Sequence, residues 1–497
     1  MPAPAATLES LPFDNSFARL PEVFYTRLAP TPLPTPTLVA ASREVASLIG
    51  LDEHQLQRAD FAEYFAGNRL LPGSEPLAAV YSGHQFGVWA GQLGDGRAHL
   101  LGGVSTPTGP LELQLKGAGQ TPYSRFADGR AVLRSSIREF LCSEAMAALG
   151  IPTTRALCII GSPAPVRRET IETAAVVTRV APSFVRFGSF EHWAAKGRKD
   201  EVKILADYLI DHFRPTLREE ANPYAALLSD VARRSAELIA HWQAVGFMHG
   251  VMNTDNMSIL GLTLDYGPFG FMEAFDAHHI CNHSDEQGRY AFSMQPRIAH
   301  WNLYALGNAL QSLIDPEQLE SLIDGAYIPR YESHFLQLMR AKLGFASAQD
   351  GDEDFLGETY GLLQRQHLDH TNFFRTLSQL QGEPAEATRA QADAALRDQF
   401  IDREAGDAWL ASWRARLAQE HSVDAERQAR MLAVNPKYVL RNWLAEAAIR
   451  QAREGDFSEI ERLLDCLRKP FDEQPHNAHY AKLPPDWASH LEVSCSS

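Results

Sequence analysis

The spacing of apolar side chains along the chain changes its period near residue 190. Before that point, short segments alternate between apolar and polar residues. The clearest is LELQLK at 111–116, which predicts a half-buried strand with Lys116 at its end on the polar face. Two more strands are predicted at 157–160 and 174–180. This part of the chain is therefore expected to be rich in β-structure.

One helix is predicted within this β-rich part. Apolar residues recur at helical spacing between residues 130 and 149. Gly150 and Pro152 follow, and these residue types commonly end helices. We therefore expect a single helix between the strands.

The second part of the chain is predominantly helical in its pattern. Residues 223–246 predict one long helix that leads directly into a loop at His249. Residues 258–260 and 262–264 predict a short hairpin that carries Asp265. Further amphipathic helices are predicted at 301–314, 407–417 and 439–452.

Proline and glycine mark the irregular parts of the N-terminal region. Residues 1–40 are rich in proline and alanine and predict an extended arm on the surface. Residues 80–105 are rich in glycine, and Asp95-Gly96 is a typical hairpin turn. With the helical second part, these patterns predict an α+β fold.

Composition narrows the functional classes. The 497-residue chain is long enough for two or more cores, and its net charge of −16 argues against nucleic-acid or membrane binding. It contains no apolar run long enough to span a membrane and no N-terminal secretory signal. Five scattered cysteines without a CxxC spacing are typical of a reducing compartment. We therefore expect a cytoplasmic protein.

The segment HGVMNTDN, from His249 to Asn256, and the LDYG turn at 264–267 are the most informative about chemistry. In kinase active sites an aspartate follows the histidine by two residues, an asparagine comes five residues later, and a metal-binding aspartate stands in an Asp-aromatic-Gly turn. Asn256 and Asp265 stand at this spacing, but Val251 takes the place of the first aspartate. Valine cannot accept a proton. The pattern indicates a phosphotransferase-like site that keeps its metal ligands and lacks the usual base.

Lys116 and Glu139 are candidates for a pair at the phosphates. Lys116 ends the predicted strand, and Glu139 lies 23 residues later on the predicted helix, off its apolar stripe. The glutamate could face a wet cleft or simply solvent, and the alternative is that both are solvated surface charges. Their order in the chain, ahead of Asn256 and the Asp-Tyr-Gly turn, favours the paired interpretation.

Asn256 and Asp265 are candidate metal ligands. They offer an amide oxygen and a carboxylate, and magnesium near phosphates takes one or two protein ligands with water and phosphate oxygens. Asp255 is a candidate replacement for the missing base, although in an extended chain its side chain would point away from that of Asn256. The alternative for all three is a structural role in turns or caps.

Arg179 and Arg186 lie seven residues apart and could clamp a polyphosphate, or could be ordinary surface arginines. Glycines that let backbone N–H groups approach phosphate oxygens suggest a nucleotide rim. The candidates for this rim are Gly94, Gly96, Arg97, Asp128 and Gly129.

Four long blocks of this sequence closely resemble the selenoprotein O family. They are YSGHQFGVWAGQLGDGR, LQLKGAGQTPYSRFADGRAVLRSSIREFL, HGVMNTDNMSILGLTLDYGPFGFMEAF and NPKYVLRN. The resemblance implies a protein-kinase-like bilobal fold with a β-rich N-lobe and a helical C-lobe. It also implies transfer of AMP from ATP to Ser, Thr or Tyr hydroxyls of proteins, with ATP bound in a flipped orientation.

The resemblance assigns the candidate residues to ATP. Lys116 would pair with Glu139 and contact phosphates, while Arg179 and Arg186 would hold the reversed polyphosphate tail. Asp265 would also contact the nucleotide. The remaining nucleotide contacts would be Gly94, Gly96, Arg97, Asp128 and Gly129.

The same resemblance implies which residues bind the metal and which residue acts as the base. Asn256 and Asp265 would bind Mg²⁺ or Mn²⁺, and Asp255 would accept the proton of the attacking hydroxyl. Because Val251 removes the base that a kinase needs at the γ-phosphate, a flipped nucleotide is consistent with this sequence.

The resemblance also divides the chain into four segments and names its partners. Residues 1–75 would wrap a core made of an N-lobe at 76–190 and a C-lobe at 191–330, and 331–497 would form a C-terminal helical region. The expected partners are ATP and hydroxyl-bearing proteins, redox proteins among them, and the protein is expected to be a monomer.

Two cysteines imply a possible switch. Eukaryotic members of this family carry selenocysteine three residues from the C-terminus, where this chain has Cys495. The resemblance implies a disulfide between this residue and Cys281. Two alternatives to AMP transfer remain open from the sequence: an ordinary γ-phosphotransferase, and a nucleotide-binding pseudokinase that acts as a scaffold.

Overall fold

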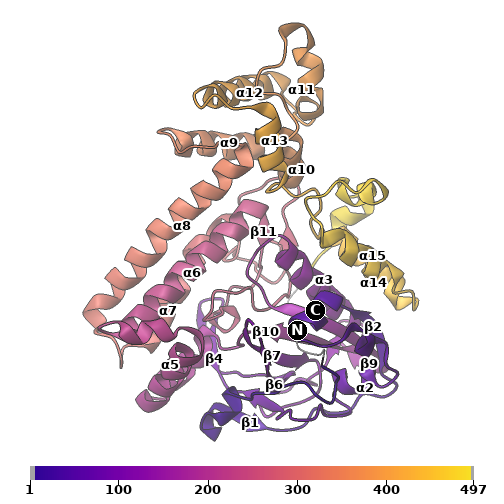
Figure 1. The fold of residues 1–497 in the computed structure, drawn as a ribbon, viewed down its shortest axis with the longest axis vertical. Helices are drawn as coiled ribbons and strands as arrows, with labels where there is room; N and C mark the ends of the chain where they lie inside the picture. The colour runs from indigo at the N-terminus through magenta and orange to yellow at the C-terminus, as the bar shows by residue number, and fades with distance from the viewer. Residues whose placement is uncertain (1–5, 494–497) are drawn as a thin grey trace.

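The computed structural model describes residues 6–493 and has the predicted mixture of helices and strands (Figure 1). An antiparallel eight-stranded sheet lies in the lower part of Figure 1, with strand order β1-β3-β6-β7-β10-β9-β2 and β8 paired to β10. The strands are β1 (Tyr25–Arg27), β2 (Thr37–Ala41), β3 (Leu77–Ala79), β6 (Ala98–Thr106), β7 (Gly109–Lys116), β8 (Ala131–Val132), β9 (Arg155–Arg167) and β10 (Ile171–Ala181). The predicted strands correspond to β7, β9 and β10, which confirms them.

The N-terminal segment is more than a surface arm. Its strands β1 and β2 form the two opposite ends of the sheet, and Leu8 and Phe24 are buried. Short edge strands cover backbone groups that would otherwise be left unpaired. The prediction of an arm on the surface was therefore wrong for much of this segment.

The turn predicted at Asp95-Gly96 does not connect paired strands. β5 (Val88–Gln92) pairs with β4 (Ser82–Gln85) in a separate two-stranded sheet, and β6 pairs with β7 through a turn at Thr106–Gly109. The buried Asp95 carboxylate accepts a hydrogen bond from the Ala79 N–H instead. Tertiary contacts, rather than local turn chemistry, determine the conformation here.

The predicted helix between the strands is α3 (Leu133–Ala148), and it is buried on nearly every side. The sheet packs against it on one side, and two C-terminal helices, α14 (Asn442–Arg453) and α15 (Ser458–Leu467), pack on the other (Figure 1). Polar residues on this helix therefore face protein, which the helical pattern alone does not predict.

The long predicted helix is α6 (Pro223–Val245). The Asn222 side chain accepts hydrogen bonds from the first turn, and Gly246 at φ 73° ends the helix in the left-handed region. α8 lies along α6, and both cross the left side of Figure 1. The other helices before residue 350 are α1 (Arg43–Leu48), α2 (Phe61–Phe65), α4 (Phe187–Ala195), α5 (Lys199–Phe213), α7 (Gln295–Ala309) and α8 (Leu319–Leu343).

Helices between residues 350 and 435 form a second layer at the top of Figure 1, around a hydrophobic core that they share with residues of the segment 244–345. They are α9 (Asp352–Gln366), α10 (His370–Leu377), α11 (Arg389–Arg397), α12 (Arg403–Ala418) and α13 (Asp424–Leu432). The helices predicted at 407–417 and 439–452 correspond to α12 and α14, whereas the one predicted at 301–314 starts and ends earlier, as α7. Within residues 6–493, no helix combines the length and apolar character needed to cross a bilayer.

The hairpin predicted to carry Asp265 does not form. Its residues make isolated bridges only, Thr263 with Met257 and Thr153, and Ser258 with Arg186. β11 (Phe247–Met248) pairs instead with β12 (Gly270–Phe271). The strand pair closes both ends of one long loop. This loop contains His249, Asn256 and Asp265.

Candidate functional site

Four charged side chains from four different elements meet at the centre of the site. Lys116 Nζ, at the end of β7, donates a hydrogen bond to Glu139 Oε2 of α3 at 2.5 Å and another to Asp265 Oδ1. Arg179 of β10 places Nη1 3.4 Å from Glu139 Oε1 and 3.3 Å from Asp265 Oδ1. Lys116 and Glu139 are only 7% and 2% exposed. The alternative interpretation as solvated surface charges is therefore wrong.

The charges in this cluster balance, and Asp265 is held ionised. Burial by itself would raise the pKa of Asp265, but the positive charges of Lys116 and Arg179 hold it well below its usual range. The Tyr266 N–H also donates to Asp265 Oδ1 at 3.0 Å. A permanently ionised carboxylate is what a metal ligand requires.

The two candidate arginines are both buried, so neither is a surface arginine. Arg179 donates to the side-chain oxygen of Gln114 on the neighbouring strand, and its guanidinium lies 5.2 Å from the Phe184 ring centroid. Arg186 Nη1 donates to the Asp255 carbonyl at 3.0 Å, and its guanidinium lies 4.4 Å from the ring centroid of Tyr81. Both cations are thus oriented by the protein.

His249 holds the loop in shape. Its ring stacks on Trp242, and Nδ1 accepts a hydrogen bond from the Val251 N–H at 3.3 Å. Burial lowers the pKa of His249 to about 4, so the imidazole is neutral. Asn256 Nδ2 donates to the Val251 carbonyl at 3.0 Å, which leaves the amide oxygen as its remaining ligand atom.

Asp255 lies in a short 3-10 turn, Thr254–Asn256, and not in the extended segment considered from the sequence. Its Oδ2 accepts from Gln85 Nε2 at 3.3 Å, while Oδ1 is buried without a hydrogen-bond partner among the described residues. Burial raises the pKa of Asp255 to about 6. An unsatisfied carboxylate oxygen inside a protein indicates a site for a ligand or a proton.

Asp255 forms part of the wall of a cavity of about 790 Å³. The wall brings together all five residues of the predicted nucleotide rim, namely Gly94, Gly96, Arg97, Asp128 and Gly129. The cluster around Lys116 is not part of this wall as the structure describes it. Arg186 interacts with both, because it donates to the Asp255 carbonyl and its charge also interacts with that of Asp265 in the cluster.

Two rim glycines are required by geometry. Gly94 has φ 142°, and a Cβ there would lie 2.5 Å from the Tyr123 ring. Gly129 has φ 70°, and its Cβ would lie 2.3 Å from the Gln120 backbone nitrogen. A larger residue at either position would shift the rim.

The Asp128 side chain is hydrogen-bonded to two arginine residues of the protein. Its carboxylate binds Arg168 at 2.7 Å and accepts from the Arg130 N–H at 2.9 Å. The hydrogen bond from Arg168 lowers the pKa of Asp128. Asp128 therefore shapes the rim and holds an arginine there, whatever it contacts in a nucleotide.

Sequence reasoning missed three residues that support the site. Gln114 orients Arg179, Gln85 contacts Asp255, and Asp95 joins the rim to β3 and accepts from Gln114 at 3.4 Å. Gln114 alternates with apolar neighbours on its strand, which was the one available signal. Nothing local in the sequence distinguished the other two.

The residues present fit a metal that is bound mainly by phosphate and water. Residues 6–493 contain no group of three or more His, Cys, Asp or Glu side chains suited to hold a metal. A magnesium ion on a polyphosphate needs only one or two protein ligands. The Asp265 carboxylate and the Asn256 amide oxygen supply these, and the unpartnered oxygen of Asp255 belongs to the residue directly before Asn256.

Sequence comparison relates this chain to characterised families along most of its length. Residues 7–468 match the family model described as protein adenylyltransferase SelO. The chain is 67% identical to protein nucleotidyltransferase YdiU of Dechloromonas aromatica (strain RCB), over 98% of this chain and 99% of that protein. It is 60% identical to protein nucleotidyltransferase YdiU of Herminiimonas arsenicoxydans, over 100% of this chain and 99% of the relative.

Proposed function

The chain belongs to the family of protein adenylyltransferase SelO, and on this premise we propose that it is a protein adenylyltransferase that binds ATP in a flipped orientation. It transfers AMP to Ser, Thr or Tyr hydroxyls of proteins and releases pyrophosphate. The activity follows from the family. The orientation of ATP and the role of each residue are our proposal.

The position of Asp255 relative to the buried cations supports the roles proposed for these residues. Asp255, which has an unpartnered carboxylate oxygen, lies on the cavity wall. Arg186 donates to the Asp255 carbonyl, and its charge also interacts with that of Asp265 in the buried cluster. Three cations on the inner side suit the β- and γ-phosphates, and the carboxylate at the cavity suits an incoming hydroxyl. We therefore propose that the α-phosphate, rather than the γ-phosphate, lies next to the acceptor.

The reaction is an in-line displacement at the α-phosphorus. The acceptor oxygen forms a bond to phosphorus as the bond to pyrophosphate breaks, and the hydroxyl proton passes to Asp255. Lys116, Arg179 and Arg186 neutralise the pyrophosphate that leaves. Mg²⁺ or Mn²⁺, held by Asn256 and Asp265, would supply further positive charge on the phosphates when bound.

We further propose a protein-kinase-like bilobal arrangement with the segments 1–75, 76–190, 191–330 and 331–497. Its support is the order of the parts: Lys116 on a strand, Glu139 on the next helix, and Asn256 and Asp265 on one loop. The protein is proposed to act in the cytoplasm as a monomer on hydroxyl-bearing proteins, redox proteins among them.

Two ATP analogues test the proposal directly. An analogue with a methylene bridge between the α- and β-phosphates should block transfer, whereas one with the bridge between β and γ should still donate AMP. Intact mass of the acceptor should show a gain equal to AMP. The opposite pattern, with a gain equal to one phosphate, would mean a γ-phosphotransferase, and binding without either gain would mean a pseudokinase.

Variants test the roles of the residues. Asp265→Ala and Asp255→Asn should each abolish AMP transfer, because one removes a metal ligand and the other the proton acceptor. Asp354→Asn, at an exposed position of α9, is the matched control and should leave transfer unchanged. Full activity of Asp255→Asn would show that another group accepts the proton.

A further inference from the structure

We infer that Phe126 is the nucleobase-binding residue of this site, and that its ring stacks on the base of the bound nucleotide at the outer end of the cavity. The inference rests on the proposed function, since it requires ATP to lie with its base outward. Phe126 would then determine which nucleobase the site prefers.

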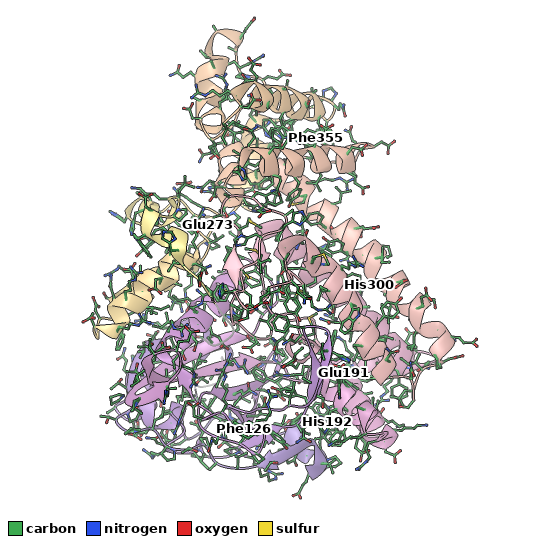
Figure 2. The ribbon with its side chains drawn as sticks, turned by 180° about the vertical axis from the view of Figure 1, so that it is seen from behind. Phe126, Glu191, His192, Glu273, His300 and Phe355 are labelled. Carbon is green, nitrogen blue, oxygen red and sulfur yellow. The ribbon has the colours of Figure 1, made fainter. Side chains whose placement is uncertain are left out.

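Phe126 is fully exposed, at 106% of the reference area, yet it lines the same cavity as Asp255. Figure 2 shows it in the sheet-containing part of the molecule. A large apolar ring at the wall of a polar cavity gains by being removed from water, so it favours a ligand with a flat apolar face. Every nucleobase has such a face.

Hydrogen bonds hold the loop that carries the Phe126 ring in a defined conformation. Thr121 Oγ1 donates to the Asp95 carbonyl at 2.8 Å, Gln120 Nε2 donates to the Ala127 carbonyl at 2.8 Å, and the Ala127 N–H donates to the Ser124 carbonyl at 2.9 Å. Arg125, directly before the phenylalanine, has φ 54°. A non-glycine residue in this region is strained, and such strain is commonly found where a loop must present a side chain to a ligand.

The cavity wall holds two other aromatic residues, and both are already packed. The Tyr81 ring lies under the guanidinium of Arg186. The Tyr123 ring lies against Gly94, and its hydroxyl is hydrogen-bonded to Thr26 at 3.0 Å. Of the three aromatic rings on this wall, Phe126 is therefore the one that presents its faces to a ligand.

Burial distinguishes the cations of the site. Lys116, Arg179 and Arg186 are buried and suit phosphates, and a neutral base gains little from them. The cavity wall also holds arginines, of which Arg168 pairs with Asp128 and Arg130 donates to the carbonyls of Thr31 and Pro32. The loop with Phe126 continues directly into Asp128 and Gly129 of the rim. The adenosine half of ATP is thus expected at this loop and the phosphates at the buried cations.

Substitution of Phe126 in the full-length protein tests the inference, with inorganic tripolyphosphate as a ligand that has the phosphates without the base. Stacking on an aromatic ring contributes about 1–3 kcal/mol per base, so Phe126→Ala should raise the KM for ATP between about fivefold and a hundredfold. Inhibition by tripolyphosphate should not change. Phe126→Trp should restore the KM for ATP, whereas Phe126→Leu, which is apolar but not aromatic, should not.

Base preference and fluorescence provide independent readouts. Because a purine stacks more strongly than a pyrimidine, the preference for ATP over UTP should fall in Phe126→Ala. ATP should quench the added fluorescence of Phe126→Trp, and tripolyphosphate should not. Ile401→Ala, which shortens another highly exposed side chain in the C-terminal helical layer, is the matched control and should behave as the wild-type protein.

Three outcomes would overturn the inference. They are an unchanged KM for ATP in Phe126→Ala, an equal loss of ATP and tripolyphosphate binding, and a rise confined to the KM for the acceptor protein. Each leaves the wild-type protein transferring AMP. Failure of the proposed function would instead appear as a wild-type protein that transfers no AMP.

Discussion

Lys116 donates a hydrogen bond to Glu139 across 2.5 Å, from the end of β7 to the second turn of α3, where both side chains are buried. Glu139 uses its other carboxylate oxygen for Arg179. The pair therefore fixes two of the three cations proposed to hold the phosphates.

Removal of the Glu139 carboxylate should destabilise the protein and weaken catalysis together. Breaking a buried ion pair from one side costs about 3–5 kcal/mol, so Glu139→Ala should lower the free energy of unfolding by an amount of that order. The KM for ATP should also rise, because Lys116 and Arg179 would lose their common anchor. Urea unfolding and steady-state kinetics measure the two effects.

A surface pair supplies the control for this variant. Asp407 binds Arg397 at 2.5 Å, and both are partly exposed. Exposed pairs contribute about 0–1 kcal/mol, so Asp407→Ala should have little effect on stability and none on activity. Equal behaviour of the two variants would contradict a special role for the Lys116–Glu139 pair.

Glu112 should make stability depend on pH. It is buried on β7 and accepts from the Phe184 N–H at 2.9 Å, and burial raises its pKa from 4.5 to about 8. Between these two pKa values the folded protein binds more protons at this group than the unfolded chain does. Its contribution to stability is therefore complete at low pH and is lost as the pH rises from 4.5 to about 8.

The test is the fall of the unfolding free energy between pH 4.5 and about 8, which should be smaller in Glu112→Gln than in the wild-type protein by up to about 5 kcal/mol. His99, whose pKa burial lowers from 6.5 to about 4, acts in the opposite sense only below 6.5. Above pH 6.5 the difference between the two proteins reports Glu112, because Lys342, whose pKa burial lowers to about 7, titrates in both. A slope that the substitution leaves unchanged there would exclude this carboxyl as the cause.

Gly83 should be required for the position of the proposed base. A Cβ at this residue would lie 2.9 Å from Thr254 Oγ1 and 3.0 Å from Asp255 Oδ1. Gly83→Ala should therefore displace Asp255 by a few tenths of an ångström and lower kcat by about tenfold, with little change in the KM for ATP. Gly325→Ala, where a Cβ meets nothing within 4 Å, is the control. Normal kcat in Gly83→Ala would show that Asp255 tolerates displacement.

The C-terminal tail should communicate with the catalytic loop through Cys281. Cys495 lies outside the described residues, but the His283 N–H donates to the Val493 carbonyl at 2.9 Å, two residues from each cysteine. The Cys281 thiol donates to the Pro268 carbonyl at 3.0 Å, and a Cβ on Gly250 would lie 2.9 Å from its sulfur. A disulfide at this position would tie the tail to the loop that carries Asp255 and Asp265.

Peptide mapping of the oxidised protein should recover a disulfide-linked pair of peptides with Cys281 and Cys495, and AMP transfer should differ between oxidised and reduced protein. Cys495→Ser should remove both effects. Cys466→Ser, at a buried cysteine of α15, is the control. A redox effect that persists in Cys495→Ser would exclude this pairing.

Much of the local structure and of the site's composition was predictable from the sequence. The alternation that ends at Lys116, the helical spacing around Glu139 and the caps of α6 are short-range patterns, and the structure confirms the elements they predict. The long blocks of residues that resemble one family were sufficient to identify it, because many exact matches at fixed spacing do not arise by chance.

The tertiary structure alone decided which candidates meet. Periodicity left Glu139 facing either a cleft or solvent. It is buried against Lys116 because the sheet and the C-terminal helices α14 and α15 enclose α3 from opposite sides. Likewise, Gln85 reaches Asp255 and Gln114 orients Arg179 across 170 and 65 residues of chain. Local patterns carry no information about such distant partners, since burial and ion pairing are set by what packs against a residue and not by its neighbours in sequence.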